Sequence, residues 1–223
     1  MSDSQDLTET FYGRFAGIYD TLAAAPVVRS WRARCAEELA LSSGDTVVEM
    51  GCGTGANLPA LRERVGSEGT VVGVDLVPAM LRRARARAER HGWANVHIVR
   101  GDARRPPVAR ADALVSTFVV GMLEDPGSAV RSWLGLVRPG GHVALLNAAR
   151  TDRPVLWPAN LLFRVFTRLT APGHRLQLDS PTRHLERRWA ESVDALFDGT
   201  VDRLTDRLGL GFIVLASGRL PEE

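Results

Sequence analysis

The sequence predicts an α/β fold in which a mostly parallel sheet is covered by helices on both faces. Short apolar segments rich in β-branched residues alternate with segments whose apolar residues recur at helical spacing. This alternation is typical of parallel sheets, because each crossover helix packs back onto the sheet. The expected strands are 46–50, 71–75, 96–100, 112–117 and 142–147. The expected helices are 11–41, 56–65, 78–91, 124–137 and 184–197.

Proline and glycine mark several of these boundaries. Pro78 suits the first position of its helix, and Gly92 suits the end of the same helix. The sequence Arg-Pro-Gly-Gly at 138–141 is expected to end the preceding helix and to turn the chain into the fifth strand. After residue 150 the regular pattern breaks, and the proline-containing stretch 151–183 is typical of an insertion or lid.

The chain is expected to end in two paired strands, near 200–205 and 211–217. The sequence Gly-Leu-Gly at 209–211 joins them. A connection this short makes the two strands antiparallel. A length of 223 residues suits one domain with a sizeable core.

Composition narrows the classes of partner and compartment. Hydrophobic residues make up 45% and charged residues 24%, as in ordinary soluble proteins, and a net charge of +2 gives no argument for a nucleic-acid partner. Cys35 and Cys52 form no disulfide framework, which fits a reducing cytosol. The polar N-terminus is not expected to act as a signal peptide, and the apolar stretch 155–169 is expected to be too short and too charged to span a bilayer. We therefore expect a cytoplasmic protein.

The most informative segment is 47–55, Val-Val-Glu-Met-Gly-Cys-Gly-Thr-Gly. It describes a buried strand, a tight turn and the start of a helix. Glycine allows both the dihedral angles of such a turn and close approach to a ligand. Gly51, Gly53 and Gly55 therefore indicate the nucleotide-binding loop of a Rossmann-like sheet, with a purely structural turn as the alternative.

Acidic residues narrow the choice of nucleotide. Dinucleotide loops usually have the spacing Gly-x-Gly-x-x-Gly, whereas this loop is Gly-x-Gly-x-Gly and follows Glu49. Asp75 ends the second strand, where a carboxylate accepts both hydroxyls of a ribose; a helix cap is the alternative. Asp102 follows the third strand, where it could accept from an adenine amino group or form a loop turn.

All 28 cationic residues are arginine, and this removes several alternatives. A short-chain dehydrogenase needs a Tyr-x-x-x-Lys pair, and a phosphate-binding NTPase loop needs Gly-Lys-Ser/Thr. A methyltransferase that modifies base amino groups would carry Asn/Asp-Pro-Pro-Tyr/Phe, but the chain has only Arg-Pro-Pro at 105–107.

Four motifs in order resemble those of class I S-adenosylmethionine (SAM)-dependent methyltransferases. They are Glu-Met-Gly-Cys-Gly-Thr-Gly at 49–55, Gly-Val-Asp at 73–75, Gly-Asp-Ala at 101–103 and Arg-Pro-Gly-Gly at 138–141. The resemblance implies SAM as cofactor, S-adenosylhomocysteine as product and a seven-stranded sheet whose last strand is antiparallel. The single domain 1–223 would comprise an N-terminal helical cap (1–43), a SAM-binding half (44–150), a lid insertion (151–183) and a C-terminal helix with a strand pair (184–223).

The same resemblance implies the cofactor contacts. The glycine loop would approach the methionine part of SAM, and Glu49 would accept from its amino group. Asp75 would bind the ribose, Asp102 the adenine amino group, and the Ala103 amide the adenine ring. The full set of expected contacts is Glu49, Gly51, Cys52, Gly53, Gly55, Asp75, Leu76, Asp102, Ala103, Ser116, Thr117 and Tyr19.

The segment 11–20 is similar to one in the ubiquinone/menaquinone methyltransferases and their phospholipid N-methyltransferase relatives, where it helps to close the cofactor site. Gly13 replaces the first aspartate of that pattern, whereas Tyr19 and Asp20 match it. The apolar, arginine-edged stretch 157–169 suits a small lipophilic acceptor, such as a quinone precursor or a phospholipid headgroup, and peripheral contact with a membrane. Core packing or a homodimer contact would explain that stretch equally.

Methyl transfer is expected to proceed by in-line displacement, which depends chiefly on positioning and on excluding water. Tyr19, His174 and His184 are weak candidates for a general base, needed only if the acceptor must lose a proton. No metal is expected, since Asn147 stands where metal-dependent O-methyltransferases tend to have an acid. We expect a small-molecule acceptor and no nucleic acid. A SAM- or nucleotide-binding regulatory protein without catalysis, or a methyltransferase acting on a polar metabolite or RNA, are the alternatives.

Overall fold

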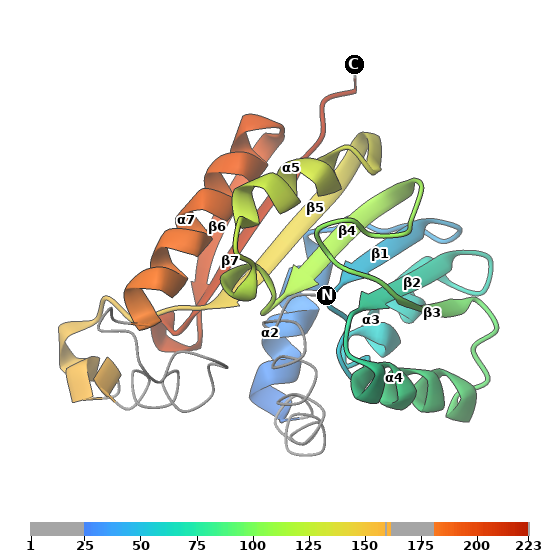
Figure 1. The fold of residues 1–223 in the computed structure, drawn as a ribbon, viewed down its shortest axis with the longest axis horizontal. Helices are drawn as coiled ribbons and strands as arrows, with labels where there is room; N and C mark the ends of the chain where they lie inside the picture. The colour runs from blue at the N-terminus through green and yellow to red at the C-terminus, as the bar shows by residue number, and fades with distance from the viewer. Residues whose placement is uncertain (1–24, 159, 162–180, 223) are drawn as a thin grey trace.

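A seven-stranded sheet lies between helices in the computed structural model, which describes residues 25–158, 160–161 and 181–222 (Figure 1). The strands are β1 (Thr46–Met50), β2 (Thr70–Asp75), β3 (Val96–Arg100), β4 (Ala111–Thr117), β5 (Val137–Ala148), β6 (Val201–Leu208) and β7 (Ile213–Arg219). The α-helices are α2 (Pro26–Glu37), α3 (Leu58–Val65), α4 (Pro78–Arg90), α5 (Pro126–Leu134) and α7 (Pro181–Asp198). Short 3₁₀ turns are η1 (Val120–Met122), η2 (Pro154–Leu156) and η3 (Gly209–Gly211).

The strand order is β3-β2-β1-β4-β5-β7-β6. β1 pairs in parallel with both β2 and β4, and β7 pairs antiparallel with both β5 and β6. The predicted fold class and the antiparallel insertion of the last strand are therefore confirmed. Because strand order reverses between β1 and β4, a crevice is expected outside their carboxyl ends, where ligands bind in open α/β sheets.

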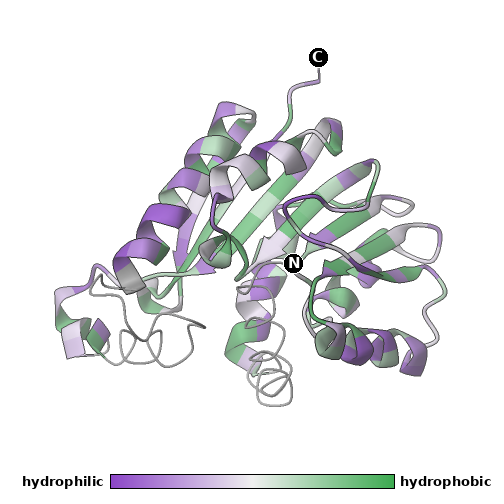
Figure 2. Cartoon of the chain, in the orientation of Figure 1, coloured by the Kyte–Doolittle hydropathy of each residue, from purple (hydrophilic) through white to green (hydrophobic). Residues whose placement is uncertain are grey.

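The sheet buries a separate apolar core on each face. On one face α2, α3 and α4 cover residues such as Val47, Val71 and Leu146. On the other, α5 and α7 pack over residues such as Met50 and Leu145. Figure 2 shows the resulting pattern, with apolar strands inside and hydrophilic stretches on α4 and α7. Such double coverage explains why the parallel strands are near-continuous apolar runs in the sequence.

The expected boundary between the fourth helix and the fifth strand is wrong. α5 ends at Leu134 and β5 already begins at Val137, so the segment 138–141 lies inside β5. There it forms a bulge, because the pairing with β4 shifts between the partners of Ala111 and Ala113. Arg138 Nη1 lies 2.8 Å from Asp112 Oδ1. This motif therefore stabilises the amino end of the strand, away from the carboxyl end of β1.

The N-terminal expectations are tested only in part. Of the expected helix 11–41, α2 is present and ends at Glu37, while the segment 11–20 and Tyr19 lie outside the described residues. Likewise, α7 begins at Pro181, inside the expected lid 151–183, most of which also lies outside them. Among the described residues no helix is long and apolar enough to cross a membrane.

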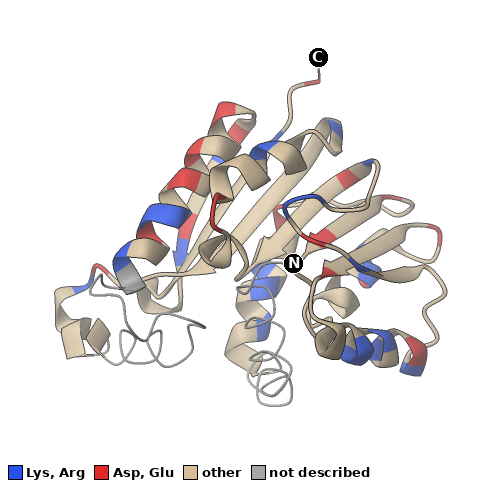
Figure 3. Cartoon of the chain, viewed as in Figure 1, with Lys and Arg blue, Asp and Glu red and all other residues tan. Residues whose placement is uncertain are grey.

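Charge is distributed differently on the two outer helices. Figure 3 shows a mainly basic α4, whereas α7 carries both signs. Two of the α4 arginines donate to backbone: Arg85 Nη2 to Ile98 O at 3.1 Å and Arg87 Nε to Thr54 O at 3.2 Å. These two guanidinium groups therefore help to fix α4 against β3 and the glycine loop.

Candidate cofactor site

The glycine loop between β1 and α3 is bonded to β2. The amides of Gly51 and Cys52 donate to Val74 O at 2.8 and 3.0 Å, and all three loop glycines have left-handed φ angles of 71°, 53° and 76°. That conformation costs a non-glycine residue roughly 1–2 kcal/mol. The loop is therefore held in place by the neighbouring strand and depends on glycine for its path.

The three glycines differ in what surrounds them. A Cβ at Gly51 would lie 2.1 Å from Val119 Cγ2, and one at Gly55 would lie 2.5 Å from Leu58 Cδ1. A Cβ at Gly53 would meet nothing within 4 Å. Gly51 and Gly55 therefore allow close packing within the protein, whereas Gly53 exposes its backbone to open space that a ligand can enter.

Asp75 joins the glycine loop to the start of α4. Its Oδ2 accepts from the Gly53 amide at 2.8 Å, and its Oδ1 accepts from the Val77 amide at 2.9 Å. Val77, not Asp75, occupies the cap position of α4. Burial raises the pKa of the Asp75 carboxyl, while these backbone hydrogen bonds oppose the rise. The aspartate therefore holds two loops together at the carboxyl end of β2.

Glu49 is fully buried in β1, next to the loop. Its Oε1 accepts from Asn57 Nδ2 at 2.6 Å, while its Oε2 has no hydrogen-bond partner in the described part of the chain. Burial raises the pKa of this carboxyl to about 7, although the positive charge of Arg32 lowers it. A buried carboxylate oxygen without a partner is costly unless a ligand supplies a donor.

Two residues missed in the sequence complete this cluster. Asn57 stands at the cap position of α3, yet its side chain makes no cap hydrogen bond and turns to Glu49 instead. Arg32 on α2 donates from Nη1 to Asn57 Oδ1 at 3.2 Å and to Thr117 Oγ1 at 3.1 Å. Thr117, at the end of β4, also accepts from Asn57 Nδ2 at 3.1 Å.

The third acidic residue is already engaged within its own loop. Arg104 Nη2 donates to Asp102 Oδ2 at 2.6 Å, and the Arg104 amide donates to Asp102 Oδ1 at 2.9 Å. The hydrogen bond from Arg104 lowers the pKa of the Asp102 carboxyl. The neighbouring Ala103 carbonyl accepts from Trp133 Nε1 at 2.6 Å, which fixes the loop against α5. The expected adenine contacts of Asp102 and Ala103 stay predictions.

Three other expected contact residues have structural partners. Ser116 Oγ donates to Met50 O at 3.1 Å, and Leu76 O accepts from Arg100 Nε at 3.3 Å. Cys52 Sγ packs beneath Gly73, where a Cβ would lie 3.0 Å away. Burial raises the pKa of the Cys52 thiol, so this cysteine is a core residue. The expected cofactor contacts of Ser116, Leu76 and Cys52 stay predictions.

Of the candidate bases, Tyr19 and His174 lie outside the described residues. His184 lies on α7, with its Nδ1 3.4 Å from Arg187 Nη2. No group of three or more metal-ligating side chains occurs in the described ranges.

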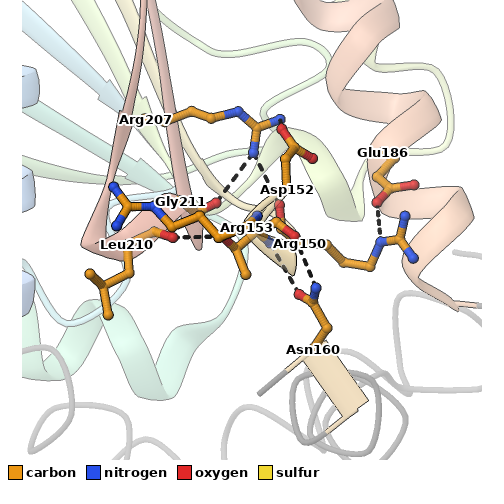
Figure 4. A network of polar contacts seen from close by, with 9 residues as sticks. Arg150, Asp152, Arg153, Asn160, Glu186, Arg207, Leu210 and Gly211 are labelled. Atoms are coloured by element: carbon orange, nitrogen blue, oxygen red, sulfur yellow. Dashed lines mark hydrogen bonds and ion pairs between the residues drawn. The ribbon is translucent and has the colours of Figure 1, made fainter. Parts of the chain in front are cut away.

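A polar network fixes the segment that follows β5 (Figure 4). Thr151 Oγ1 donates to Leu210 O at 2.6 Å, and Asn160 Nδ2 donates to Thr151 O at 2.9 Å. Arg207 Nη2 lies 2.9 Å from Asp152 Oδ2. Arg150 on the same segment pairs with Glu186 of α7 at 2.6 Å (Figure 4). The part of the expected lid that the structure describes is therefore anchored to both the β6–β7 turn and α7.

Two further buried donors lie near Gly121, beyond the carboxyl end of β4. Arg188 Nη1 donates to Gly121 O at 3.0 Å, and a Cβ on Gly121 would lie 2.9 Å from Asn147 Nδ2. Neither Arg188 Nε nor Asn147 Nδ2 has a partner within the described ranges. The carboxyl end of β5 and helix α7 therefore each carry one buried donor atom for which the described part of the chain provides no acceptor.

The groups around the glycine loop fit a nucleoside joined to an amino acid. Gly53 offers open space, Asp75 a carboxylate at the end of β2, and Glu49 a carboxylate oxygen able to accept from an amine. All three lie at the strand-order reversal where nucleotides bind in such sheets.

Comparison with known proteins supports this fit. Residues 47–141 match the family model described as a methyltransferase domain. The chain is 34% identical to a phosphatidylethanolamine N-methyltransferase of Cereibacter sphaeroides, over 66% of this chain and 71% of that protein. It is 31% identical to a 2-phytyl-1,4-naphtoquinone methyltransferase of Thermosynechococcus vestitus, over 66% and 67% of the two chains. The chain spans about half the length of two other curated relatives, 47% and 48%.

A solved structure shows the same fold. It is a SAM-dependent methyltransferase from Aquifex aeolicus, with a TM-score of 0.65 and 16% identity over 92% of this chain and 98% of that chain. The identity to the two curated methyltransferases, the matched domain and a site that fits SAM agree with one another. The chain belongs to the family of SAM-dependent methyltransferases.

Proposed function

We propose that the protein transfers a methyl group from SAM to a small lipophilic acceptor. The observation that carries the proposal is the buried, half-satisfied carboxylate of Glu49 beside the open backbone of Gly53. An unpaired buried acceptor next to a nucleotide-type loop calls for a ligand that carries both an amine and a nucleoside.

In this proposal each end of the cofactor has its own residues. Glu49 Oε2 accepts from the amino group, and the Gly53 backbone passes close to the methionine chain. Asp75 binds the ribose hydroxyls through the lone pairs that its two backbone hydrogen bonds leave free. Asp102 reaches the adenine amino group by sharing its carboxylate with Arg104.

The bound cofactor supplies an electrophilic methyl group on a sulfonium. The chain contributes position and surroundings, since in-line displacement requires the nucleophile near 3 Å from that carbon and a site without water. The Asp75 contact holds the ribose on one side of the sulfur, and the Glu49 contact holds the amino group on the other. The apolar cores on the two faces of the sheet limit the access of water from the sheet side of the site.

Several features favour a lipophilic acceptor with an oxygen atom. Val155, Trp157 and Leu161 are 86%, 68% and 52% exposed on the anchored segment after β5. The buried donors Asn147 Nδ2 and Arg188 Nε would receive a carbonyl or phosphate oxygen of that acceptor. The names of two relatives, one acting on a naphthoquinone and one on phosphatidylethanolamine, describe acceptors of this kind.

The test is incubation of the purified protein with methyl-labelled SAM and a cell extract. The protein is expected to transfer label to a molecule that partitions into organic solvent, and mass spectrometry then identifies it. Heat-treated protein serves as the control. Label in RNA or in water-soluble metabolites would refute the lipophilic acceptor. Tight SAM binding without any transfer would favour a non-catalytic regulatory protein.

Replacing Asp75 by alanine is expected to weaken binding of S-adenosylhomocysteine by roughly 5- to 150-fold, or about 1–3 kcal/mol. The change removes the ribose acceptor and the bonds that hold the Gly53 and Val77 amides. Calorimetric titration measures the effect.

Asp112→Ala is the matched control for that change. Asp112 Oδ2 also accepts from a backbone amide, that of Thr46, but at the opposite end of the sheet. Its loss is expected to lower the melting temperature while leaving the affinity for S-adenosylhomocysteine unchanged. Equal affinities of wild type and Asp75→Ala would contradict the ribose role.

A further inference from the structure

The exposed large apolar side chains gather at one edge of the sheet. In the described part of the chain they are Val27, Met122, Val155, Trp157, Leu161, Val201 and Leu210. Six of these seven follow the carboxyl ends of β4, β5 and β6 or lie in the first turn of α2, whereas Val201 begins β6 at the opposite edge. Single exposed apolar residues are ordinary, but their gathering at one edge indicates an interaction surface.

Five of these residues belong to elements that contact one another. Thr151 Oγ1 donates to Leu210 O at 2.6 Å, so the segment after β5 is attached to the β6–β7 turn. A Cβ at Gly209 in the same turn would lie 2.6 Å from Trp31 Cζ2 of α2, and Val27 lies one helical turn before Trp31. The surface that we call the apolar rim consists of Val27, Val155, Trp157, Leu161 and Leu210.

The segment after β5 carries the rim away from the body of the molecule. The Thr151 amide donates to Asn160 Oδ1 at 3.1 Å and Asn160 Nδ2 donates to Thr151 O at 2.9 Å, which closes the chain between them into a loop. Turn η2 lies within this loop, and Figure 1 shows it standing away from the sheet. Val155 and Trp157 are 86% and 68% exposed, so the loop presents apolar side chains outward.

Leu210 adds a strained position to the apolar rim. Its φ of 60° costs a leucine roughly 1–2 kcal/mol, and its side chain is nevertheless 58% exposed. A leucine at this position therefore gains little burial within the chain and bears a backbone cost. Contact with a surface outside the chain explains why an apolar side chain stands there.

Positive charge lies next to the apolar rim. Arg29 and Arg153 are both exposed, and each is two residues from a valine of the rim. Asp152 is the only acidic residue of the segment 149–161, and its Oδ2 lies 2.9 Å from Arg207 Nη2. The carboxylate nearest to the loop is thus already paired with an arginine. A cationic border of this kind is complementary to anionic lipid headgroups.

We propose that the apolar rim docks onto the surface of an anionic phospholipid bilayer. Trp157 and the aliphatic side chains enter the interfacial region, while Arg29 and Arg153 bind lipid phosphates. Tryptophan is typical of this region, because its ring is apolar and its N–H group is polar. Vesicle binding needs neither SAM nor an acceptor, so this docking is separate from the proposed methyl transfer.

A bilayer suits the shape of the apolar rim better than a folded partner does. Stable interfaces between folded proteins comprise roughly 20–30 residues on each side and require a complementary surface. The rim is a projecting loop with single apolar residues beside it, and the interfacial region of a bilayer adapts to such a projection. Docking there turns the carboxyl edge of the sheet, where the cofactor residues lie, toward the phase in which lipophilic molecules dissolve.

Vesicle flotation tests the docking. The purified protein is mixed with vesicles of phosphatidylcholine alone, or of equal parts of phosphatidylcholine and phosphatidylglycerol. The variants are Val155→Ser and the double variant Val155→Ser/Trp157→Ser. Val201→Ser is the matched control, because it makes the same exchange at an exposed valine on the opposite edge of the sheet.

Wild type is expected to float with the mixed vesicles and much less with phosphatidylcholine alone. The double variant should bind the mixed vesicles about 10-fold more weakly, because two apolar side chains no longer leave water, and Val155→Ser should show part of this loss. Val201→Ser should bind like wild type. All three variants are expected to keep the wild-type affinity for S-adenosylhomocysteine, which shows that they are folded.

The charge contribution is tested in the same way. Arg153→Gln is expected to weaken binding to the mixed vesicles about 5-fold and to lower its dependence on salt, with no change on phosphatidylcholine alone. Arg110→Gln is the control, since Arg110 is an exposed arginine that precedes β4 at the opposite edge of the sheet.

Three results would overturn the docking. They are a wild-type protein that does not float with the mixed vesicles, equal binding by wild type and the double variant, and a wild-type dimer that dissociates in the double variant. Analytical ultracentrifugation without vesicles detects the last of these, which would assign the apolar rim to a second copy of the chain. The proposed function fails separately, if wild type binds neither S-adenosylhomocysteine nor SAM.

Discussion

Gly51→Ala is expected to lower the free energy of unfolding by about 2–5 kcal/mol and to abolish cofactor binding. A Cβ there would lie 2.1 Å from Val119 Cγ2, and the residue has a φ of 71°. Overpacking costs about 1–3 kcal/mol and the left-handed backbone about 1–2 kcal/mol. Urea denaturation measures the stability, and titration with S-adenosylhomocysteine measures the affinity.

Gly53→Ala separates the two causes. A Cβ at that position meets no atom within 4 Å, so only the cost of the left-handed backbone, about 1–2 kcal/mol, applies to folding. Its affinity for S-adenosylhomocysteine should nevertheless fall at least 10-fold, since the new methyl occupies the space that the cofactor enters. Wild-type affinity in a folded Gly53→Ala protein would contradict the placement of the cofactor over this glycine.

Glu49→Gln is expected to flatten the pH dependence of both stability and cofactor affinity. The pKa of the Glu49 carboxyl rises from 4.5 to about 7 on folding, so the folded state binds the proton more tightly. Stability from this group is present below pH 4.5 and is lost as pH rises through 7. Wild type should therefore lose about 2–3 kcal/mol relative to the variant between pH 5 and pH 8.

Cofactor binding should show the opposite trend. An ammonium next to Glu49 Oε2 favours the ionised carboxylate, so the affinity of wild type for S-adenosylhomocysteine should rise about 10-fold or more between pH 5.5 and pH 7.5. Glu49→Gln should bind more weakly and with little pH dependence. Chemical denaturation and calorimetry across that range provide the measurements. A parallel pH profile in the two proteins would exclude the contact between Glu49 and the amino group.

The strands of the sheet could be predicted because the pattern of apolar and polar residues that defines each strand lies within a few consecutive residues. Each of the first four strands is a short apolar run bounded by polar or turn residues, and their observed bounds differ from the expected ones by at most one residue. The predicted boundary between the helix 124–137 and the strand 142–147 was wrong because pairing with a distant strand decides it. Residues 138–141 have turn chemistry, but pairing with β4 on one side of a bulge keeps them within β5.

The site could be predicted only where it follows the chain. Glu49, the glycines and Asp75 lie at strand ends, a position that the local pattern reveals. Arg32 lies 17 residues before Glu49 on another element, and only the packing of α2 brings it to the site. One signal was available: Arg32 shares a helical face with Cys35, Ala36 and Leu39, which are all buried.

Asn57 shows the other limit of local reasoning. An asparagine before a helix predicts a cap, worth about 1 kcal/mol. In the structure this cap hydrogen bond is absent, and the Asn57 side chain donates to Glu49 instead. A local preference that is overridden in this way is typical of a functional position, and only the three-dimensional arrangement exposes it.

The order of the strands places the residues assigned to the cofactor on one part of the sheet and the segment after β5 with helix α7 on the other. Every described residue assigned to the cofactor lies between Arg32 and Thr117, on the β3-β2-β1-β4 side of the sheet. The anchored segment after β5 and helix α7 attach on the other side of β4, through bonds to the β6–β7 turn and to one another. Because distant sites contribute independently to free energies, substitutions in the segment after β5 and in α7 are expected to leave the affinity for the cofactor unchanged.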